Sequence, residues 1–476
     1  MLTFAIYTFG CKVNQLESEA LASAFRQAGF PLCAKTDCED ILIINTCTVT
    51  SKADQKARRI IRKTLRDNQD TCVLVTGCYA ELDTEEIKAL EGDIPGRGGQ
   101  LFVFKGKEKH NLLDLPFYLK NAEKNDLPSF IKIWSEKISE TSGHLFDEDY
   151  KPGYKPEIKP GYKPGNKHFF APEQFSYHSR AFLKIQDGCD RQCSYCRVRL
   201  ARGKSQSLEA ELALKELIHL EEKGFAEVVL VGVNITEYRN DSVKDLAGLL
   251  GYLLSGTKKI ALRLSSLEPD CIDENLIAVL SNKRIRPHFH LAVQSGSEKI
   301  LKQMARSYSP ETVTKAVALL RSVKKDPFLA CDIITGFPGE TDDDFQKTQT
   351  LCETIDFAWI HAFPYSKRPG TPAFSFPGDV CTSIVAKRNQ ILTNLAKKGK
   401  NTYTKRWIGS DIEVIIEKGT TENPSQVTGL SENYLKLLVN CSGKPEPGSL
   451  LRCRLLENAG SKKVQINDTD AVAEVI

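Results

Sequence analysis

Three cysteines stand close together in the segment IQDGCDRQCSYCRV. They are Cys189, Cys193 and Cys196, in a C-x3-C-x2-C spacing that directly follows an apolar run typical of a strand. Thiolates at this spacing can bind three irons of a cubane iron-sulfur cluster and leave the fourth iron open for a ligand. The alternative, a zinc knuckle, needs a fourth Cys or His nearby, and none lies between Phe182 and Ile218. The segment therefore predicts an iron-sulfur cluster with an open position.

Three further cysteines share a different position. Cys11, Cys47 and Cys78 each come directly after a short apolar run in the first part of the chain. In a parallel sheet the carboxyl ends of neighbouring strands meet at one edge, so thiols far apart in sequence can converge there. Convergence would allow a second cluster, whereas three independently buried cysteines remain the alternative from spacing alone.

The elements that must position these cysteines are visible in the hydrophobic pattern. Short apolar runs alternate with polar segments of helical period, which indicates an α/β domain with a parallel, doubly wound sheet. The expected strands are 4–9, 41–45 and 73–76, and the expected helices are 15–28 and 52–67. From residue 181 the alternation resumes with six βα units, which predict a partial (β/α)6 barrel. The expected barrel strands are 182–186, 228–232, 260–265, 289–293, 329–335 and 358–363.

The chain is thus predicted to contain several domains, as its length of 476 residues requires. We expect an α/β domain over 1–140 and a barrel over 177–403. The region 141–176 between them is expected to be a linker, because KPGYKP occurs twice in it. The tail, 404–476, contains the alternating runs DIEVIIEK, YLKLLVN and LLRCRLL, which indicate a small antiparallel β-barrel.

The motifs around the cysteines resemble those of the radical S-adenosylmethionine (SAM) methylthiotransferases. FGCKVNQLES, NTCTVT and TGCYAE are similar to the three cysteine motifs of that family's amino-terminal domain, and the tail resembles a TRAM domain. GCKVN, QSGS, ITGFPGE and FPYSKRPGTPA are most similar to the branch that acts on N6-threonylcarbamoyladenosine at tRNA position 37. The resemblance covers nearly the whole chain.

The resemblance implies an enzyme with two [4Fe-4S] clusters. Cys189, Cys193 and Cys196 would hold the cluster that binds SAM and cleaves it to a 5'-deoxyadenosyl radical, whereas the other three cysteines would hold a cluster that carries the transferred sulfur. One SAM would donate the methyl group and another the radical. The anticodon arm of tRNA would be the substrate, and flavodoxin or ferredoxin would supply electrons. The resemblance also implies contacts to SAM from residues outside the cluster motif: Tyr195, Ser265, Gln294 and Arg306.

Three alternatives remain open at this point. The substrate could be isopentenyladenosine at position 37 of tRNA or an aspartate of a ribosomal protein, because sister branches of the family modify these. A protein of another class, a non-catalytic iron-sulfur protein that binds RNA, would not cleave SAM. A zinc-binding RNA module would contain no iron.

Other features constrain the location and the partners. No apolar run reaches the 18 residues of a membrane span, and the start lacks a signal peptide, so we expect a cytoplasmic protein. Fifteen cysteines in that compartment indicate metal ligands or buried thiols. His288 and His290 alternate on one strand and either line the barrel interior or bind a metal. Basic residues recur over 52–66 and 397–406, which could bind RNA phosphates.

Overall fold

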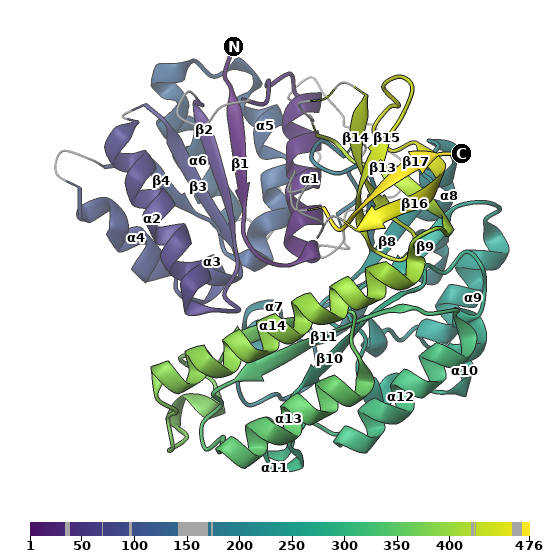
Figure 1. Cartoon of the computed structure of the whole chain (residues 1–476). Coiled ribbons are helices and arrows are strands. Elements are labelled where there is room, and N and C mark those ends of the chain that lie inside the picture. Colours follow the sequence, from purple (N-terminus) through teal and green to yellow (C-terminus); the bar gives the residue numbers. More distant parts are fainter. Residues whose placement is uncertain are drawn as a thin grey trace. The chain divides into compact units, whose positions relative to one another are not determined.

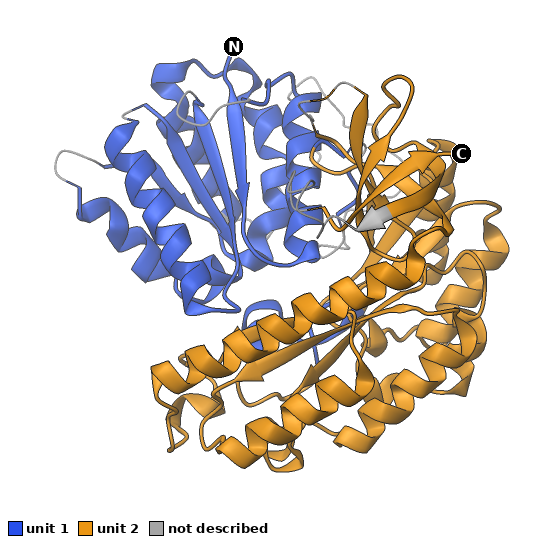
Figure 2. Ribbon diagram, viewed as in Figure 1, with its two compact units in different colours: residues 1–176, 187–190, 196–206 blue, residues 177–186, 191–195, 207–476 orange. Residues whose placement is uncertain are grey.

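The structure is a computed structural model. It describes residues 1–33, 39–68, 70–94, 98–140, 170–172, 175–419, 423, 425–458 and 469–476, and it divides into two compact units (Figure 2). Unit 1 comprises residues 1–176, 187–190 and 196–206, and unit 2 comprises 177–186, 191–195 and 207–476. The KPGYKP repeats of the expected linker lie outside the described residues.

Unit 1 contains a four-stranded parallel sheet. Its strands are β1 (Phe4–Thr8), β2 (Ile41–Thr46), β3 (Cys72–Gly77) and β4 (Leu101–Val103), and they pair in this order. All side chains of β2 and β3 are buried, as expected for a sheet that is covered on both faces. The three strands expected from sequence are therefore confirmed, and the short β4 is an addition.

The order of the strands in the sheet brings the loops that carry the cysteines together. After β1 the chain runs through α1 (Lys12–Gln27) to Leu32, which forms a parallel bridge with Phe4. It then returns to pair β2 with β1 and continues outward to β3. A doubly wound sheet binds its ligands at the carboxyl ends of the strands where the winding direction reverses. In unit 1 this point lies at the carboxyl ends of β1 and β2.

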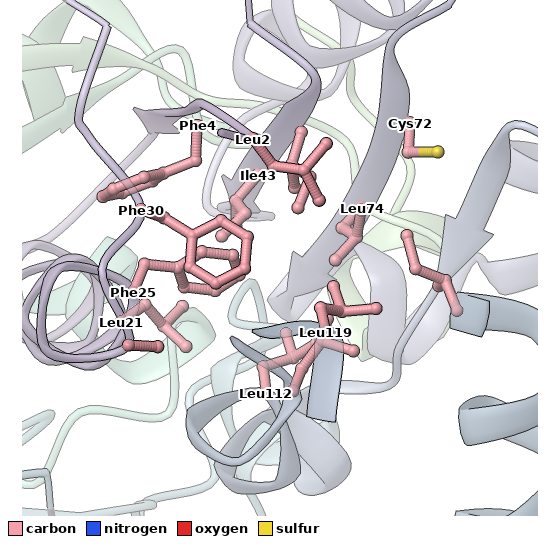
Figure 3. Packing of buried hydrophobic residues seen from close by; sticks show 14 of the residues in the cluster. Leu2, Phe4, Leu21, Phe25, Phe30, Ile43, Cys72, Leu74, Leu112 and Leu119 are labelled. Atoms are coloured by element: carbon pink, nitrogen blue, oxygen red, sulfur yellow. The ribbon is translucent and has the colours of Figure 1, made fainter. Parts of the chain in front are cut away.

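Helices cover both faces of this sheet. On one face Leu21 and Phe25 of α1 pack in one core cluster with Phe4 of β1 and with residues of α6 (Leu127–Glu140) (Figure 3). On the other face Ala57 and Ile61 of α2 (Ser51–Asp67) pack in a second cluster with residues of β2 and β3. The two separate clusters confirm the doubly wound arrangement, and their burial stabilises the sheet that carries the cysteine loops.

Unit 2 contains the partial barrel as two parallel sheets. The first has the strands β5 (Ala181–Lys184), β8 (Glu227–Val231) and β9 (Ala261–Leu264), and the second has β10 (His288–Gln294), β11 (Phe328–Thr335) and β12 (Trp359–Pro364). Two single bridges, Leu262 with Ile285 and Leu267 with Leu291, join the sheets. The six barrel strands expected from sequence are thus confirmed.

Helices follow these strands as the βα pattern requires (Figure 1). They are α8 (Ala210–Glu222), α9 (Leu246–Gly256), α10 (Glu274–Leu280), α11 (Glu298–Gln303), α12 (Pro310–Val323) and α13 (Asp342–Ile355). Several begin at a side chain that caps the first turn, for example Ser309 before α12 and Thr341 before α13. These caps fix where α12 and α13 begin.

The last part of unit 2 is a helix followed by a closed barrel. The helix is α14 (Thr382–Trp407), and the strands are β13 (Asp411–Ile416), β14 (Gln426–Ser431), β15 (Lys436–Asn440), β16 (Leu450–Asn458) and β17 (Ala471–Val475). Four neighbouring pairs are antiparallel as expected, but β15 and β17 are parallel. A ring with an odd number of strands cannot alternate in direction throughout, so one parallel pair is required.

Buried ion pairs connect this barrel to the rest of unit 2. Glu227 of β8 pairs with Arg263 at 2.6 Å and with Arg286 at 2.9 Å, and Arg286 also contacts Glu413 of β13 at 2.6 Å. Burial alone would raise the pKa of Glu227, but the surrounding arginines lower it to about 2. The pairs of Glu227 are buried, whereas Glu413 is half exposed, so β13 is joined to the partial barrel by the partly exposed end of this network.

No helix within the described ranges is both long enough and apolar enough to cross a membrane.

Candidate functional site

Three cysteines of unit 1, Cys11, Cys47 and Cys78, lie at the carboxyl edge of its sheet. Cys11 precedes the first turn of α1, Cys47 follows β2, and Cys78 begins α3 (Cys78–Leu82) directly after β3. Cys47 and Cys78 are 4% and 8% exposed, whereas Cys11 is exposed. The three thiols thus come from three neighbouring strand ends and differ in their access to solvent.

Glycines allow the cysteine loops to approach one another. Gly10 has a φ of +99°, and a Cβ atom there would lie 2.6 Å from Sγ of Cys47. Gly77 has a φ of +102°, and its Cβ would lie 2.3 Å from the carbonyl oxygen of Thr46. Both positions combine a left-handed backbone with a close contact, which only glycine tolerates. Gly10, which precedes Cys11, therefore lies in direct contact with Cys47. Gly77, which precedes Cys78, lies in direct contact with Thr46, the residue before Cys47.

The electrostatics of the thiols also indicate convergence. Burial, together with the neighbouring Cys11 and Cys78, raises the pKa of Cys47 to about 12. Burial likewise raises the pKa of Cys78, while the positive charges of Arg202 and Lys109 oppose that rise. Thiolates close together in a buried site repel one another, and a bound metal centre removes that cost by coordinating them.

An asparagine holds two of these loops together. The Nδ2 atom of Asn14 donates to the carbonyl oxygens of Phe9 at 2.8 Å and Thr46 at 2.9 Å. Asn45, at the end of β2, donates back to the carbonyl oxygen of Asn14 at 2.9 Å. The turns before Cys11 and Cys47 are therefore fixed by hydrogen bonds that are buried or partly buried, and these are costly to leave unmade.

A buried ionic network lies beside the same loops. Arg202 donates to Asn14 at 2.6 Å, to Glu17 at 3.0 Å and to Asp187 at 2.9 Å. Lys109 pairs with Glu17 from the other side and donates to Asn45 at 3.0 Å. Sequence reasoning missed this network because its members are far apart in the chain and have no common motif.

Two of the cysteines in the C-x3-C-x2-C motif, Cys189 and Cys196, group with unit 1. The N–H group of Cys189 donates to the carbonyl oxygen of Gly203 at 3.1 Å. Gly188 has a φ of +70°, and a Cβ there would lie 2.0 Å from the carbonyl oxygen of Lys204. The loop is therefore closed by its own backbone against the segment after α7 (Val198–Arg202).

The residue after Cys196 is bound to the loops of the other cysteine set. Arg197 makes two parallel contacts with Asp83, at 2.9 Å and 3.1 Å, and a longer one of 3.4 Å with Thr48. Asp83 ends the helix that begins at Cys78, and Thr48 directly follows Cys47. The two cysteine motifs are thus linked inside unit 1 by one bidentate ion pair.

We expect this ion pair to contribute more to the free energy of unfolding than an exposed surface pair does. The variants Arg197→Met and Asp83→Asn should each reduce the free energy of unfolding, and the double variant should lose less than their sum, with a coupling of about 1–2 kcal/mol. Denaturant unfolding of the four proteins measures this coupling. The same cycle at Arg62 and Asp93, whose side chains are 48% and 55% exposed, is the control. The control should give about 0–0.5 kcal/mol, and equal couplings in the two cycles would contradict the interpretation.

The remaining cysteine of the motif, Cys193, groups with unit 2. Nη1 of Arg306 donates to Sγ of Cys193 at 3.0 Å, and the same guanidinium pairs with Glu268. Burial raises the pKa of Glu268, although Arg306 and Arg191 oppose the rise. Arg306, which is expected near the SAM carboxylate, lies beside Cys193 of the motif and pairs with Glu268. Glu268 was not among the residues predicted from the sequence.

Tyr195 packs in the core of unit 2. It is partly buried against a cluster that includes Ile300, Met304 and Phe337, and its ring meets that of Phe337 edge-on at 6.5 Å. The N–H group of the preceding Ser194 donates to the carbonyl oxygen of Met304 at 3.1 Å. In this arrangement the tyrosine positions the cysteine loop by packing.

Ser265 and Gln294 lie at strand ends. Oγ of Ser265 and Nδ2 of Asn234 are buried and have no hydrogen-bond partner among the described residues. Buried polar atoms are normally satisfied, so an unpartnered pair in loops that follow β8 and β9 is suited to a polar ligand. Gln294 is 9% exposed and has a φ of +64°, which is uncommon for a residue other than glycine and occurs often at ligand sites.

The segment ITGFPGE forms a turn and a capped helix start. Glu340 accepts from the N–H group of Gly336 at 2.7 Å and from Arg388 at 2.6 Å, so its carboxylate is used within the protein. Thr341 caps α13 by accepting from the N–H group of Asp344. The segment therefore ends at a capped helix start, and the glutamate stabilises the turn.

These residues can be compared with the needs of the implied clusters. Within the described ranges no three His, Cys, Asp or Glu side chains are arranged to hold a single metal ion. A cubane cluster does not need that arrangement because each thiolate binds a different iron. In unit 1 the three convergent thiols, the adjacent cations and the exposed side of Cys11 fit such a cluster.

Comparison with known proteins identifies the family. Residues 3–95 match the uncharacterized protein family UPF0004, and residues 183–352 match the radical SAM superfamily. The threonylcarbamoyladenosine tRNA methylthiotransferase MtaB of Treponema pallidum is 38% identical over 468 residues, which cover 92% of this chain and 94% of that protein. The chain belongs to the radical SAM methylthiotransferases of the MtaB type.

Two further relatives belong to the same methylthiotransferase family, and one of them has the MtaB name. The protein of the same name from Thermotoga maritima is 33% identical, with 92% of this chain and 91% of that protein covered. A tRNA-2-methylthio-N(6)-dimethylallyladenosine synthase of Bacillus mycoides is 30% identical, with 95% and 83% covered. The resemblance found in the cysteine motifs is therefore confirmed over more than nine tenths of the chain. Radical SAM membership implies SAM and one [4Fe-4S] cluster.

Proposed function

We propose that this protein methylthiolates N6-threonylcarbamoyladenosine at position 37 of tRNA, replacing the hydrogen at carbon 2 of the adenine. The observation that carries the proposal is the end-to-end similarity to proteins named for this substrate, at up to 38% identity. The sister substrate, isopentenyladenosine, is supported by a lower similarity of 30%. The proposal therefore favours the first substrate.

The two cysteine sets would have separate roles. We assign Cys189, Cys193 and Cys196 to the [4Fe-4S] cluster that binds SAM, and Cys11, Cys47 and Cys78 to a second cluster. When bound, the first cluster supplies reductive cleavage of SAM and the second supplies the sulfur. The chain's own contribution is to hold both sets, and the contacts of Arg197 with Asp83 and Thr48 support this assignment.

The protein would bind SAM through residues of unit 2. The unpartnered polar atoms of Ser265 and Asn234 suit the hydroxyl groups or the amine of SAM. Arg306 would remain beside Cys193, where its positive charge favours a thiolate and an adjacent ligand carboxylate. Gln294 would present its amide from the end of β10.

The tRNA would be held by the carboxyl-terminal barrel, which we propose to be a TRAM-like RNA-binding domain, and by basic surfaces. Lys52, Lys56 and Arg59 lie exposed along one stripe of α2. Near the barrel Lys400 pairs with Asp470 at 2.9 Å and Arg406 pairs with Asp326, so the expected basic surface is reduced to the exposed lysines of this region: Lys397, Lys398 and Lys405. A flavodoxin or a ferredoxin would act as the reductant.

Nucleoside analysis tests the function. The gene for this chain, expressed in a strain that forms N6-threonylcarbamoyladenosine but cannot methylthiolate it, should cause 2-methylthio-N6-threonylcarbamoyladenosine to appear in digested tRNA. Mass spectrometry separates this product from the methylthio form of isopentenyladenosine. Appearance of the second product alone would overturn the proposed substrate, and appearance of neither would overturn the proposed reaction.

A further inference from the structure

One face of the sheet formed by β10, β11 and β12 carries a partly exposed polar patch toward the carboxyl ends of the strands. Side chains alternate across a strand, so His290, Asp332 and His361 point to one side, and the register sets Asp332 opposite His361. Their neighbours on the other side, such as Leu291 and Cys331, are completely buried. Parallel sheets usually bury apolar residues on both faces, so a partly exposed polar patch at this position indicates a ligand.

The polar groups on this face form a connected row. Nε2 of His290 lies 3.0 Å from Oδ1 of Asp332, and Nδ1 of the same ring lies 3.3 Å from Oγ of Ser266. The side chains of His290 and Asp332 are 18% and 25% exposed, so the pair is reachable while partly shielded from water. Ser266 directly follows Ser265, whose hydroxyl has no partner among the described residues. The imidazole thus lies within ion-pair distance of one carboxylate, next to a polar strand end.

Aromatic rings continue the same face along β12. His361 and Phe363 are parallel, with an interplanar angle of 13° and ring centroids 6.3 Å apart. Phe363 is 42% exposed although it belongs to a strand of the partial barrel. The rings of His361 and His290 are 5.1 Å apart, so the aromatic strip adjoins the His290–Asp332 pair. Exposed rings of this kind are the surfaces on which unstacked bases of RNA bind.

We propose that this face is the subsite for the modified nucleoside, and that it reads the threonylcarbamoyl group. This inference rests on the proposed function and adds the residues that determine specificity. The adenine would stack on the strip of Phe363 and His361. Asp332 would accept a hydrogen bond from a carbamoyl N–H or the threonyl hydroxyl, and His290 would act as a positioning residue for that carboxylate. An isopentenyl group has no donor, so it would leave the carboxylate unsatisfied, which is the basis of strong discrimination.

The test compares two substrates with the full-length, reconstituted protein. Asp332→Asn should lower kcat/KM on tRNA with N6-threonylcarbamoyladenosine by about tenfold or more. On the same tRNA with isopentenyladenosine the change should be smaller, and the dissociation constant of SAM, measured by equilibrium dialysis, should stay at the wild-type value. Asp343→Asn, which breaks an exposed ion pair with Lys347 on α13, is the matched control and should change neither substrate.

A second variant covers the case in which Asp332→Asn does not fold. Phe363→Leu removes the exposed ring from the strip and should lower kcat/KM on the first substrate by about tenfold, since stacking is worth about 1–3 kcal/mol per base. Wild-type kcat/KM in both variants would overturn the inference, as would a loss in the Asp332→Asn variant that is equal on the two substrates. A wild-type protein inactive on both substrates would instead contradict the proposed function.

Discussion

Replacement of Cys189, Cys193 and Cys196 by alanine should abolish both the cleavage of SAM and the formation of the methylthio product. The reason is that these thiols are the only protein ligands assigned to the cluster that delivers an electron to SAM. We expect a loss of at least about 1,000-fold, to the background rate, because no other group assigned here can cleave SAM reductively. Anaerobic assays for 5'-deoxyadenosine after addition of dithionite measure the effect.

The control for this prediction is a cysteine outside both sets. Cys331 is buried in β11 against Cys352, so its replacement by alanine tests whether any cysteine loss in unit 2 disturbs the reaction. The Cys331→Ala variant should be less stable, with cleavage of SAM retained at temperatures where it is folded. Continued formation of 5'-deoxyadenosine by the triple variant would exclude these cysteines as the reactive site.

Replacement of Cys11, Cys47 and Cys78 by alanine should separate the two halves of the reaction. This variant keeps the other cysteine set, so it should still form 5'-deoxyadenosine from SAM. The methylthio product should fall by at least about 1,000-fold, because the variant has no second site to supply sulfur. The two products are measured in the same anaerobic reaction with tRNA.

The structure provides a matched control for unit 1. Cys72 is completely buried at the start of β3, in the same sheet, and has no ligand role in the account. Cys72→Ala should create a small cavity and lower stability while leaving the ratio of methylthio product to 5'-deoxyadenosine at the wild-type value. A triple variant that still transferred sulfur would contradict the assignment of Cys11, Cys47 and Cys78.

Much of the scaffold could be predicted from sequence because its signals are local. The strands that carry the cysteines are short apolar runs, and the helices between them have the helical period, so both are readable one segment at a time. The position of Cys11, Cys47 and Cys78 at one edge then follows from sheet geometry. In contrast, Leu32 forms only a single bridge, which leaves no pattern in the sequence.

The parts of the site that could not be predicted from the sequence depend on contacts between residues that are far apart in the chain. Arg202 meets Glu17, 185 positions earlier, and Arg197 meets Asp83, 114 positions earlier. No periodicity or motif links such pairs, so only the folded chain reveals them. The same holds for the left-handed backbone of Gln294, because a glutamine is not a residue type that indicates positive φ. His290 was predicted to line the interior or bind a metal, and its pairing with Asp332 depends on the register of two strands.

The number of clusters can be measured as the iron and sulfide content of the protein. The measurement uses anaerobically reconstituted wild-type protein and the two triple alanine variants. If the protein holds two separate clusters, we expect about eight irons in the wild type and about four in each variant. About four irons in the wild type, lost only with Cys189, Cys193 and Cys196, would contradict the account, since a single cluster would leave the sulfur without a source in unit 1.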